Sequence, residues 1–333
     1  MGGYLMDNTG REAFWNVLKN LHGNNGASLI PVLPLPRYLC RYRSVNENAL
    51  QQLNDNTQYF SSADYYDDPF DTYFHIDFAK MMSTYEEMRK ALTERNPAFI
   101  GFVHQAAELS GQNPDEFIVL LSNTVLDFPN IQGQLLNSRL SIQKRLYSIC
   151  FCEDQYNETL WLKYAGNYTG FVQVYDMNNP YTFLCGKDEK CKKCPSLSSK
   201  ASIYPVYYSD MKYDATKYAL GMLMLDQIQS QANNTPEPIY NIIKQSLLWE
   251  AERISLIKKK CHEYDREWRM IRTIMCEQRS FIRMKPCKVV IGLRTPAYKS
   301  RLIASAATIA GVNEIHQLFI NDSDELDSKP VQL

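Results

Sequence analysis

The segments of this chain that read as strands are separated by very unequal lengths, and this spacing limits the folds that are open to it. The predicted strands lie at residues 38–43, 58–61, 147–152, 170–175, 202–208, 264–272, 288–292 and 315–320. The predicted helices lie at residues 10–22, 44–53, 211–231, 237–261 and 297–310. A regular parallel α/β repeat needs strands and helices that alternate evenly, so the spacing favours a compact α+β fold.

Residues 80–145 look mainly helical, and we expect them to be a helical insertion within one α+β domain that spans residues 1–333. We expect the five strands at 38–43, 58–61, 147–152, 170–175 and 264–272 to share a mixed or split β-sheet. The polar segment 321–333 is expected to be a loose C-terminal tail.

One of the predicted strands carries acidic residues at alternate positions. Glu263, Asp265 and Glu267 follow one another at a spacing of two, which would place three carboxylates on one face of a strand. Acidic residues are poor strand formers, so such a face needs a reason. One reason is a site in which neighbouring carboxylates stabilise positive charge. The alternative is an exposed edge strand whose charges prevent aggregation.

Composition excludes some classes of protein. With 333 residues, 45% hydrophobic and 12% aromatic, the chain can bury a sizeable core. It has no apolar run of membrane-spanning length and no recognisable secretory signal, so we expect a cytoplasmic protein without a membrane partner. Its nine cysteines are dispersed, which favours reduced thiols.

The net charge of −1 conceals a basic region. Residues 253–301 hold 14 Lys or Arg and four acidic residues. Such a surplus could contact the phosphates of a nucleic acid, or it could be a solvated face that balances acidic segments elsewhere.

Several segments together resemble the uncharacterised-domain family numbered 2971, in the order that the family has them. They are Leu39–Ser44, Phe60–Ser62, Asp67–Asp71, Leu160–Ala165, Thr169–Phe171 and Tyr264–Arg269. The chain departs from the family's pattern at three positions. It has Asp67 in place of Asn, Leu162-Lys163 without the usual His, and His262 where an aromatic residue is common.

The layout also resembles ADP-ribosyltransferases that modify DNA or RNA, at the level of the fold alone. This resemblance implies a first strand that carries Arg41 or Arg43, a middle strand with Ser61, and a late strand that ends at the catalytic residue Glu267. Asp265 would tune Glu267. Such enzymes use NAD as a substrate, and some act as toxins or in antiviral defence.

The chemistry of ADP-ribosyl transfer suits these residue types. Cleavage of the nicotinamide–ribose bond creates an oxocarbenium-like centre, which the carboxylate of Glu267 can stabilise. An arginine can bind the pyrophosphate with two parallel hydrogen bonds, and Tyr42, Trp161 or Tyr164 can stack on nicotinamide or adenine. The chain has no glycine-rich phosphate loop, which disfavours Rossmann-type binding and P-loop chemistry.

Two metal sites are alternatives. Asp68, Asp71 and Glu267 could hold Mg²⁺ in a nuclease, although such cores usually add a lysine on a strand and the sequence does not identify one. Cys191 and Cys194 have the spacing of a zinc knuckle, with Cys185 as a third ligand and no evident fourth. A basic loop with incidental cysteines is the expectation there.

A non-catalytic function is the third alternative. The chain could bind a partner protein in a toxin–antitoxin or host-defence system, with the carboxylate strand serving only as an edge. An exposed Glu267, isolated from Arg41 and Arg43, would favour this alternative.

Overall fold

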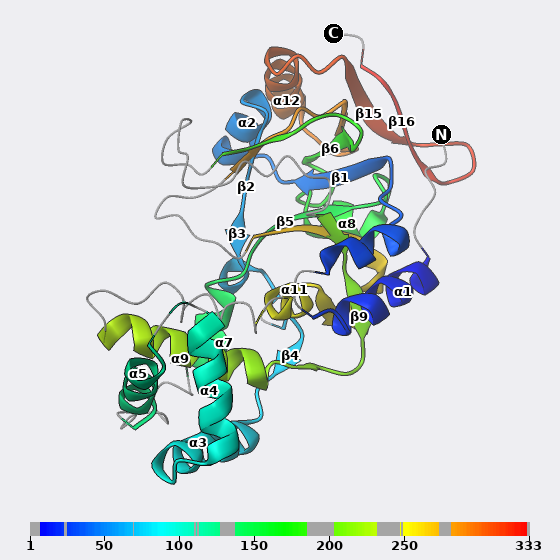
Figure 1. Cartoon of the computed structure of the whole chain (residues 1–333). Coiled ribbons are helices and arrows are strands. Elements are labelled where there is room, and N and C mark those ends of the chain that lie inside the picture. The colour runs from blue at the N-terminus through cyan, green and yellow to red at the C-terminus, as the bar shows by residue number, and fades with distance from the viewer. Residues whose placement is uncertain are drawn as a thin grey trace.

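The computed structural model describes residues 7–22, 25–68, 70–109, 111, 113–126, 137–184, 203–231, 247, 249–272 and 281–331. Among these residues a nine-stranded mixed sheet forms the centre of an α+β fold, which confirms the predicted class (Figure 1). The strand order is β16-β15-β14-β6-β1-β5-β12-β8, and β3 pairs with β5. The strands are β1 Tyr38–Arg43, β3 Ser61–Ser62, β5 Tyr147–Cys152, β6 Phe171–Asp176, β8 Ile203–Pro205, β12 Glu267–Arg272, β14 Lys288–Ile291, β15 Glu314–Ile320 and β16 Leu326–Pro330.

The sheet is joined very unevenly at its centre. β1 pairs with β6 over six residues, and β12 pairs with β5 over six residues. Between β1 and β5, which are both fully described, only Cys40 and Cys152 are register partners. The sheet therefore consists of two well-paired halves, and we call the narrow junction of β1 and β5 the seam.

Helices and three small sheets surround the main sheet. The small sheets pair β2 Thr57–Tyr59 and β7 Thr182–Leu184 with β13 Phe281–Arg283, β4 Phe74–His75 with β10 Tyr213–Asp214, and β9 Tyr207–Ser209 with β11 Ile257–Lys259. The α-helices are α1 Asn8–Lys19, α2 Glu47–Asn54, α3 Phe78–Thr93, α4 Pro97–Leu109, α5 Pro114–Leu126, α7 Ser138–Gln143, α8 Glu158–Lys163, α9 Thr216–Gln231, α11 Glu250–Ser255 and α12 Ala297–Ile309. Three-residue or longer 3-10 turns are η1 Gly26–Val32, η2 Ala63–Tyr65 and η4 Lys260–Asp265.

The helices predicted within residues 80–145 are present as α3, α4, α5 and α7. With α9 they lie at the opposite end of the molecule from α12 and β15 (Figure 1). Buried side chains such as Met81 and Tyr85 of α3 pack there with Tyr218 of α9. The main sheet has its own core, in which Trp268 and Ile149 are fully buried.

Four predicted elements are wrong in part. The strand expected at 202–208 is divided into β8, which pairs with β12, and β9, which pairs with β11. The strand expected at 264–272 begins only at Glu267, because Lys260–Asp265 forms η4. The part of the predicted helix 237–261 that is described contains α11 followed by β11, since Ile257 pairs with Tyr207 of β9. This tertiary pairing overrides the local helical pattern. The strand expected at 58–61 is divided, and β2 pairs with β13 outside the main sheet.

The C-terminal segment is not a loose tail throughout. Asn321 closes a turn, because its side-chain oxygen accepts hydrogen bonds from the backbone N–H groups of Ser323 and Glu325, each at 2.9 Å. Leu326–Pro330 then returns as β16 and pairs with β15.

Candidate functional site

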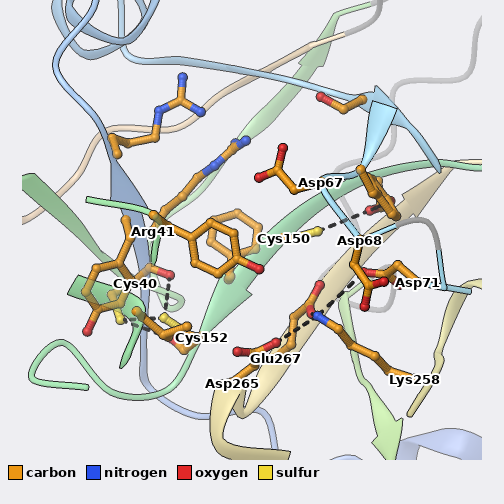
Figure 2. A pocket seen from close by; sticks show the side chains of 18 of the residues that line it. Cys40, Arg41, Asp67, Asp68, Asp71, Cys150, Cys152, Lys258, Asp265 and Glu267 are labelled. Carbon is orange, nitrogen blue, oxygen red and sulfur yellow. Dashed lines mark hydrogen bonds and ion pairs between the residues drawn. The ribbon is translucent and has the colours of Figure 1, made fainter. Parts of the chain in front are cut away.

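A pocket of about 260 Å³ lies at the seam, where β1 and β5 diverge. Figure 2 shows Arg41 on one side of it, and Asp71, Lys258, Asp265 and Glu267 together on the other. We call these the arginine wall and the acidic wall. The pocket's lining residues come from β1, β5, β3, α8, β11, η4, β12 and the loop after η2.

The pocket brings together seven of the eight residues that the sequence proposes as a site. They are Arg41, Tyr42, Arg43, Ser61, Tyr164, Asp265 and Glu267. The eighth, Trp161, does not line the pocket. Its ring is fully buried behind Tyr42, with 5.3 Å between ring centroids and a T-shaped geometry, and its Nε1 donates to the carbonyl of Gln155. Trp161 therefore supports Tyr42 and cannot stack on a ligand.

The acidic wall does not form from alternate residues of one strand, as the sequence suggests. Glu263 and Asp265 lie in η4, and Arg266 adopts a left-handed conformation (φ 43°) before the strand begins. Asp265 and Glu267 are therefore not residues of one strand face. They nevertheless meet, because the Nζ atom of Lys258 donates to Asp265 Oδ2 at 2.7 Å and to Glu267 Oε2 at 2.9 Å. Glu263 does not line the pocket and contacts Asn8 instead.

Arg269 holds the other side of the acidic wall. Its Nη2 donates to both carboxylate oxygens of Asp71, at 2.7 and 2.8 Å, and its Nε donates to Glu267 Oε1 at 2.7 Å. Its Nη1 donates to the carbonyl of Ser255 at 2.6 Å, and its guanidinium lies 5.2 Å from the ring centroid of Tyr66. Each oxygen of Glu267 therefore has a cationic partner, and the carboxylate is fixed in orientation.

The cations determine the protonation of the two acids. Burial raises the pKa of Glu267, but Arg269 and Lys258 outweigh it and hold that pKa well below its usual value. Burial raises the pKa of Asp265, the nearby Glu267 adds to the effect, and Lys258 only partly opposes it. Burial lowers the pKa of Lys258, but Glu267, Asp71 and Asp265 together raise it well above its usual value. At neutral pH Glu267 is thus an ionised carboxylate beside a protonated lysine.

The arginine wall is set by the alternation of β1. Leu39, Arg41 and Arg43 share one face of the strand, while Cys40 and Tyr42 share the other and pack near Trp161. Arg41 Nη1 donates to Gln58 Oε1 at 2.7 Å, and Arg43 Nη2 donates to Gln52 Oε1 at 2.8 Å.

The proposed magnesium ligands pair with other side chains of the protein. Asp68, Asp71 and Glu267 all line the pocket, but Asp71 and Glu267 share Arg269, while Asp68 Oδ2 lies 3.0 Å from His262 Nε2. Among the described residues, no group of three or more His, Cys, Asp or Glu side chains is arranged to hold a metal ion. The zinc candidates Cys185, Cys191 and Cys194 lie outside the described residues.

In the described part of the basic region 253–301, several basic side chains are not available at the surface. Arg253, Lys258, Arg269 and Arg272 are buried. Arg253 pairs with Glu250 at 2.9 Å, and Lys258 and Arg269 pair with the acidic wall. These three basic residues therefore balance acids inside the fold, and exposed basic residues such as Lys260, Lys285 and Arg301 lie elsewhere in the described part of the region.

Lys258 and Arg269 are the functional candidates that sequence reasoning missed. Lys258 lies in a segment with a helical pattern that forms β11, so nothing in the sequence indicated that it points at the carboxylates. Arg269 did carry a signal, because its spacing of two from Glu267 on a strand places both side chains on one face.

Comparisons with protein-family models, with curated proteins and with solved structures returned no match. The resemblances to the family numbered 2971 and to ADP-ribosyltransferases therefore stay predictions. In the part of the chain that the structure describes, no helix has the length and apolarity needed to cross a membrane.

Proposed function

We propose that the chain is an NAD-dependent enzyme of the ADP-ribosyltransferase type, which transfers ADP-ribose to a nucleic acid or protein acceptor. The observation that supports this function is the pocket at the seam, in which Arg41 lies opposite a fixed, ionised Glu267 and which Arg43 also lines. A sheet that is divided beside the pocket also supports the proposal.

The polarity of the pocket matches the polarity of NAD⁺. The dinucleotide carries negative charge on its pyrophosphate and positive charge on its nicotinamide ring. Arg41 and Arg43 suit the pyrophosphate, because a guanidinium donates two parallel hydrogen bonds to a phosphate. The acidic wall has three carboxylates against the two cations Lys258 and Arg269, so it retains negative charge that suits the nicotinamide riboside end.

Glu267 has the properties that the transfer step requires. When the bond between ribose C1′ and the nicotinamide nitrogen breaks, nicotinamide leaves with the bonding electrons and positive charge develops on the ribose. A carboxylate that is already ionised and oriented stabilises this charge without reorganising. A nucleophilic atom of the acceptor then attacks C1′ and loses its proton. Tyr42 and Tyr164 supply aromatic surface in the pocket.

A metal-dependent nuclease is the second candidate, and one observation favours it. Nuclease cores usually have a lysine on a strand beside their carboxylates, and Lys258 of β11 lies 3.5 Å from Asp71 and 2.9 Å from Glu267. Against it, Mg²⁺ would have to displace Arg269 from the fork with Asp71. The burial of Glu267 in one pocket with Arg41 and Arg43 argues against a partner-binding protein without catalysis.

The test is ligand-induced stabilisation followed by an assay of transfer. NAD⁺ should raise the melting temperature of the full chain, because a ligand that binds only the folded state stabilises it, whereas ATP with Mg²⁺ should have little effect. Labelled NAD⁺ with DNA, RNA and protein acceptors should then give labelled product. A response to Mg²⁺ that disappears in Asp71→Asn, without any response to NAD⁺, would support the nuclease instead.

A further inference from the structure

Two cysteine side chains meet at the seam. Cys40 Sγ of β1 lies 3.2 Å from Cys152 Sγ of β5, and these two residues are the one register pair that joins the two halves of the sheet. The thiols also donate across the seam, from Cys40 Sγ to the carbonyl of Cys152 at 3.2 Å and from Cys152 Sγ to the carbonyl of Cys40 at 3.4 Å. Both cysteines are free thiols in the structure.

The thiol pair is part of the wall of the pocket. Cys40 and Cys152 both line it, and Cys152 is also the register partner of Glu267 on the next strand. Cys40 lines a second, larger cavity of about 1270 Å³ as well. A small oxidant can therefore reach the sulfur atoms, although the two residues are only 2% and 6% exposed.

We propose that Cys40 and Cys152 are a reversible modification site, at which a peroxide forms a disulfide that holds the seam closed. Directly opposed residues of antiparallel strands have a Cα separation within the range that a disulfide spans. The sulfur atoms need to approach by about 1.2 Å to reach bonding distance. One cysteine gives up its proton and attacks the peroxide as a thiolate, the O–O bond breaks, and the leaving hydroxide takes up a proton, which yields a sulfenic acid and one water molecule. The second thiol attacks that sulfur and releases another, so two thiols and hydrogen peroxide give one disulfide and two water molecules.

Closing the seam should reduce binding in the pocket, a consequence that rests on the proposed function. A volume of about 260 Å³ lies below the range of about 300–1,000 Å³ that ligand pockets usually have. A dinucleotide therefore requires its two walls to separate. Arg41 lies in one half of the sheet and Glu267 in the other, and the seam is where these halves are least firmly joined. A covalent bond at this position opposes the separation.

Peptide mapping tests the disulfide without any ligand. Trypsin releases Cys40 in residues 38–41 and Cys152 in residues 146–163, which also contain Cys150. After treatment of the full chain with hydrogen peroxide, these two peptides should be linked, and dithiothreitol should separate them. The link should persist in the matched control Cys150→Ala and be lost in Cys152→Ala. An unlinked 38–41 peptide in protein whose exposed Cys261 has been oxidised would overturn the proposal.

Hydrogen exchange and ligand binding test whether the disulfide holds the seam closed. Amide hydrogen exchange in β1 and β5 should slow in the oxidised chain, and NAD⁺ should bind at least tenfold more weakly until dithiothreitol is added. Cys40→Ala should bind NAD⁺ equally well before and after peroxide, whereas Cys261→Ser should behave like the wild type. If the peptides are linked but amide exchange in β1 and β5 and the affinity for NAD⁺ do not change, the proposal that the disulfide closes the seam is wrong. If NAD⁺ binds neither form, the proposed function fails, and the peptide map and the exchange rates still decide on the disulfide.

Discussion

Two clusters of buried charged side chains differ in composition and in surroundings. The first is the acidic wall with its cations Lys258 and Arg269. The second, which we call the α1 cluster, joins Arg253 to Glu250 at 2.9 Å and to the carbonyls of Leu18 and Leu21 at the end of α1. Tyr213 completes it by donating to Glu250 at 2.6 Å.

The difference indicates what each cluster does. In the α1 cluster one acid meets one guanidinium, and all three guanidinium nitrogens donate to protein atoms, so the cluster fastens α1 to α11. The acidic wall has three carboxylates for two cations and lines a pocket. Burial of uncompensated charge is costly, and a fold retains it where a ligand uses it. Substitutions in the two clusters should therefore separate stability from activity.

The largest effect should come from the α1 cluster, as a loss of stability. Arg253→Met leaves Glu250 buried without its guanidinium partner and removes the donors to Leu18 and Leu21. Breaking a buried ion pair in this way costs about 3–5 kcal/mol. Urea unfolding should show this loss, while transfer activity per folded molecule stays at the wild-type level. A loss below about 1 kcal/mol would show that the cluster does not fasten α1.

The next effect should come from the acidic wall, as a loss of activity. Glu267→Gln keeps the size of the side chain but removes the charge that faces the ribose, which should lower the transfer rate by about 10²–10³. Asp265→Asn should cost less, because Asp265 only tunes its neighbour. Glu263→Gln is the matched control, since Glu263 lies in the same stretch outside the pocket and should retain full activity. Equal rates for Glu267→Gln and wild type would remove Glu267 from the mechanism.

A smaller effect is expected on the opposite wall. Arg41→Lys or Arg43→Lys keeps the charge and loses the two-pronged donation to phosphate, so NAD⁺ should bind about tenfold more weakly. Calorimetric titration with NAD⁺ measures this directly. Arg37→Lys is the control, because Arg37 is exposed and pairs with Asp176 outside the pocket. An equal loss of affinity for NAD⁺ in all three variants would indicate that Arg41 and Arg43 do not bind the phosphates of NAD⁺ specifically.

The smallest effect is a pH dependence with opposite signs for two neighbouring acids. The pKa of Glu267 is lowered by folding, so its contribution to stability is present above the unfolded pKa and is lost as pH falls toward the folded pKa. The pKa of Asp265 is raised, so protonation of Asp265 favours the folded state as pH falls through its folded pKa. Urea unfolding measures the free energy of unfolding from neutral to acidic pH. As the pH falls, the stability of the wild type should rise relative to Asp265→Asn. At lower pH the stability of the wild type should fall relative to Glu267→Gln. Parallel curves for both variants would contradict this assignment.

The sequence predicted much of the pocket because the relevant residues lie on strands with clear patterns. β1 and β5 occupy the predicted ranges, and the alternation of β1 places Arg41 and Arg43 on one face. The register of a strand fixes the position of every side chain along it, so a correctly predicted strand places several side chains correctly at once. The placing of Arg41 and Glu267 in one pocket followed from this regularity together with the resemblance.

The remaining features could not be predicted, because they depend on irregular backbone and on contacts between distant residues. Asp265 reaches Lys258 through a 3-10 turn and the left-handed Arg266, and neither has a sequence signal as strong as a strand pattern. Lys258 itself points into the pocket only because β11 pairs with β9, about 50 residues earlier in the chain. Trp161 was misplaced for a related reason, since the capped helix α8 turns its indole toward Tyr42.

The narrow seam also affects how the chain reaches its folded state. The register partner of Cys40 lies 112 residues later, and the six-residue pairing of β1 requires Phe171–Asp176. During synthesis β1 therefore leaves the ribosome long before any partner strand of the main sheet exists, with its backbone groups unpaired. Sheets built from such distant pairings fold slowly, and their early strands are prone to aggregate. Truncation before Phe171 should accordingly give aggregated protein, and refolding of the full chain should be limited by the assembly of β1 with β6.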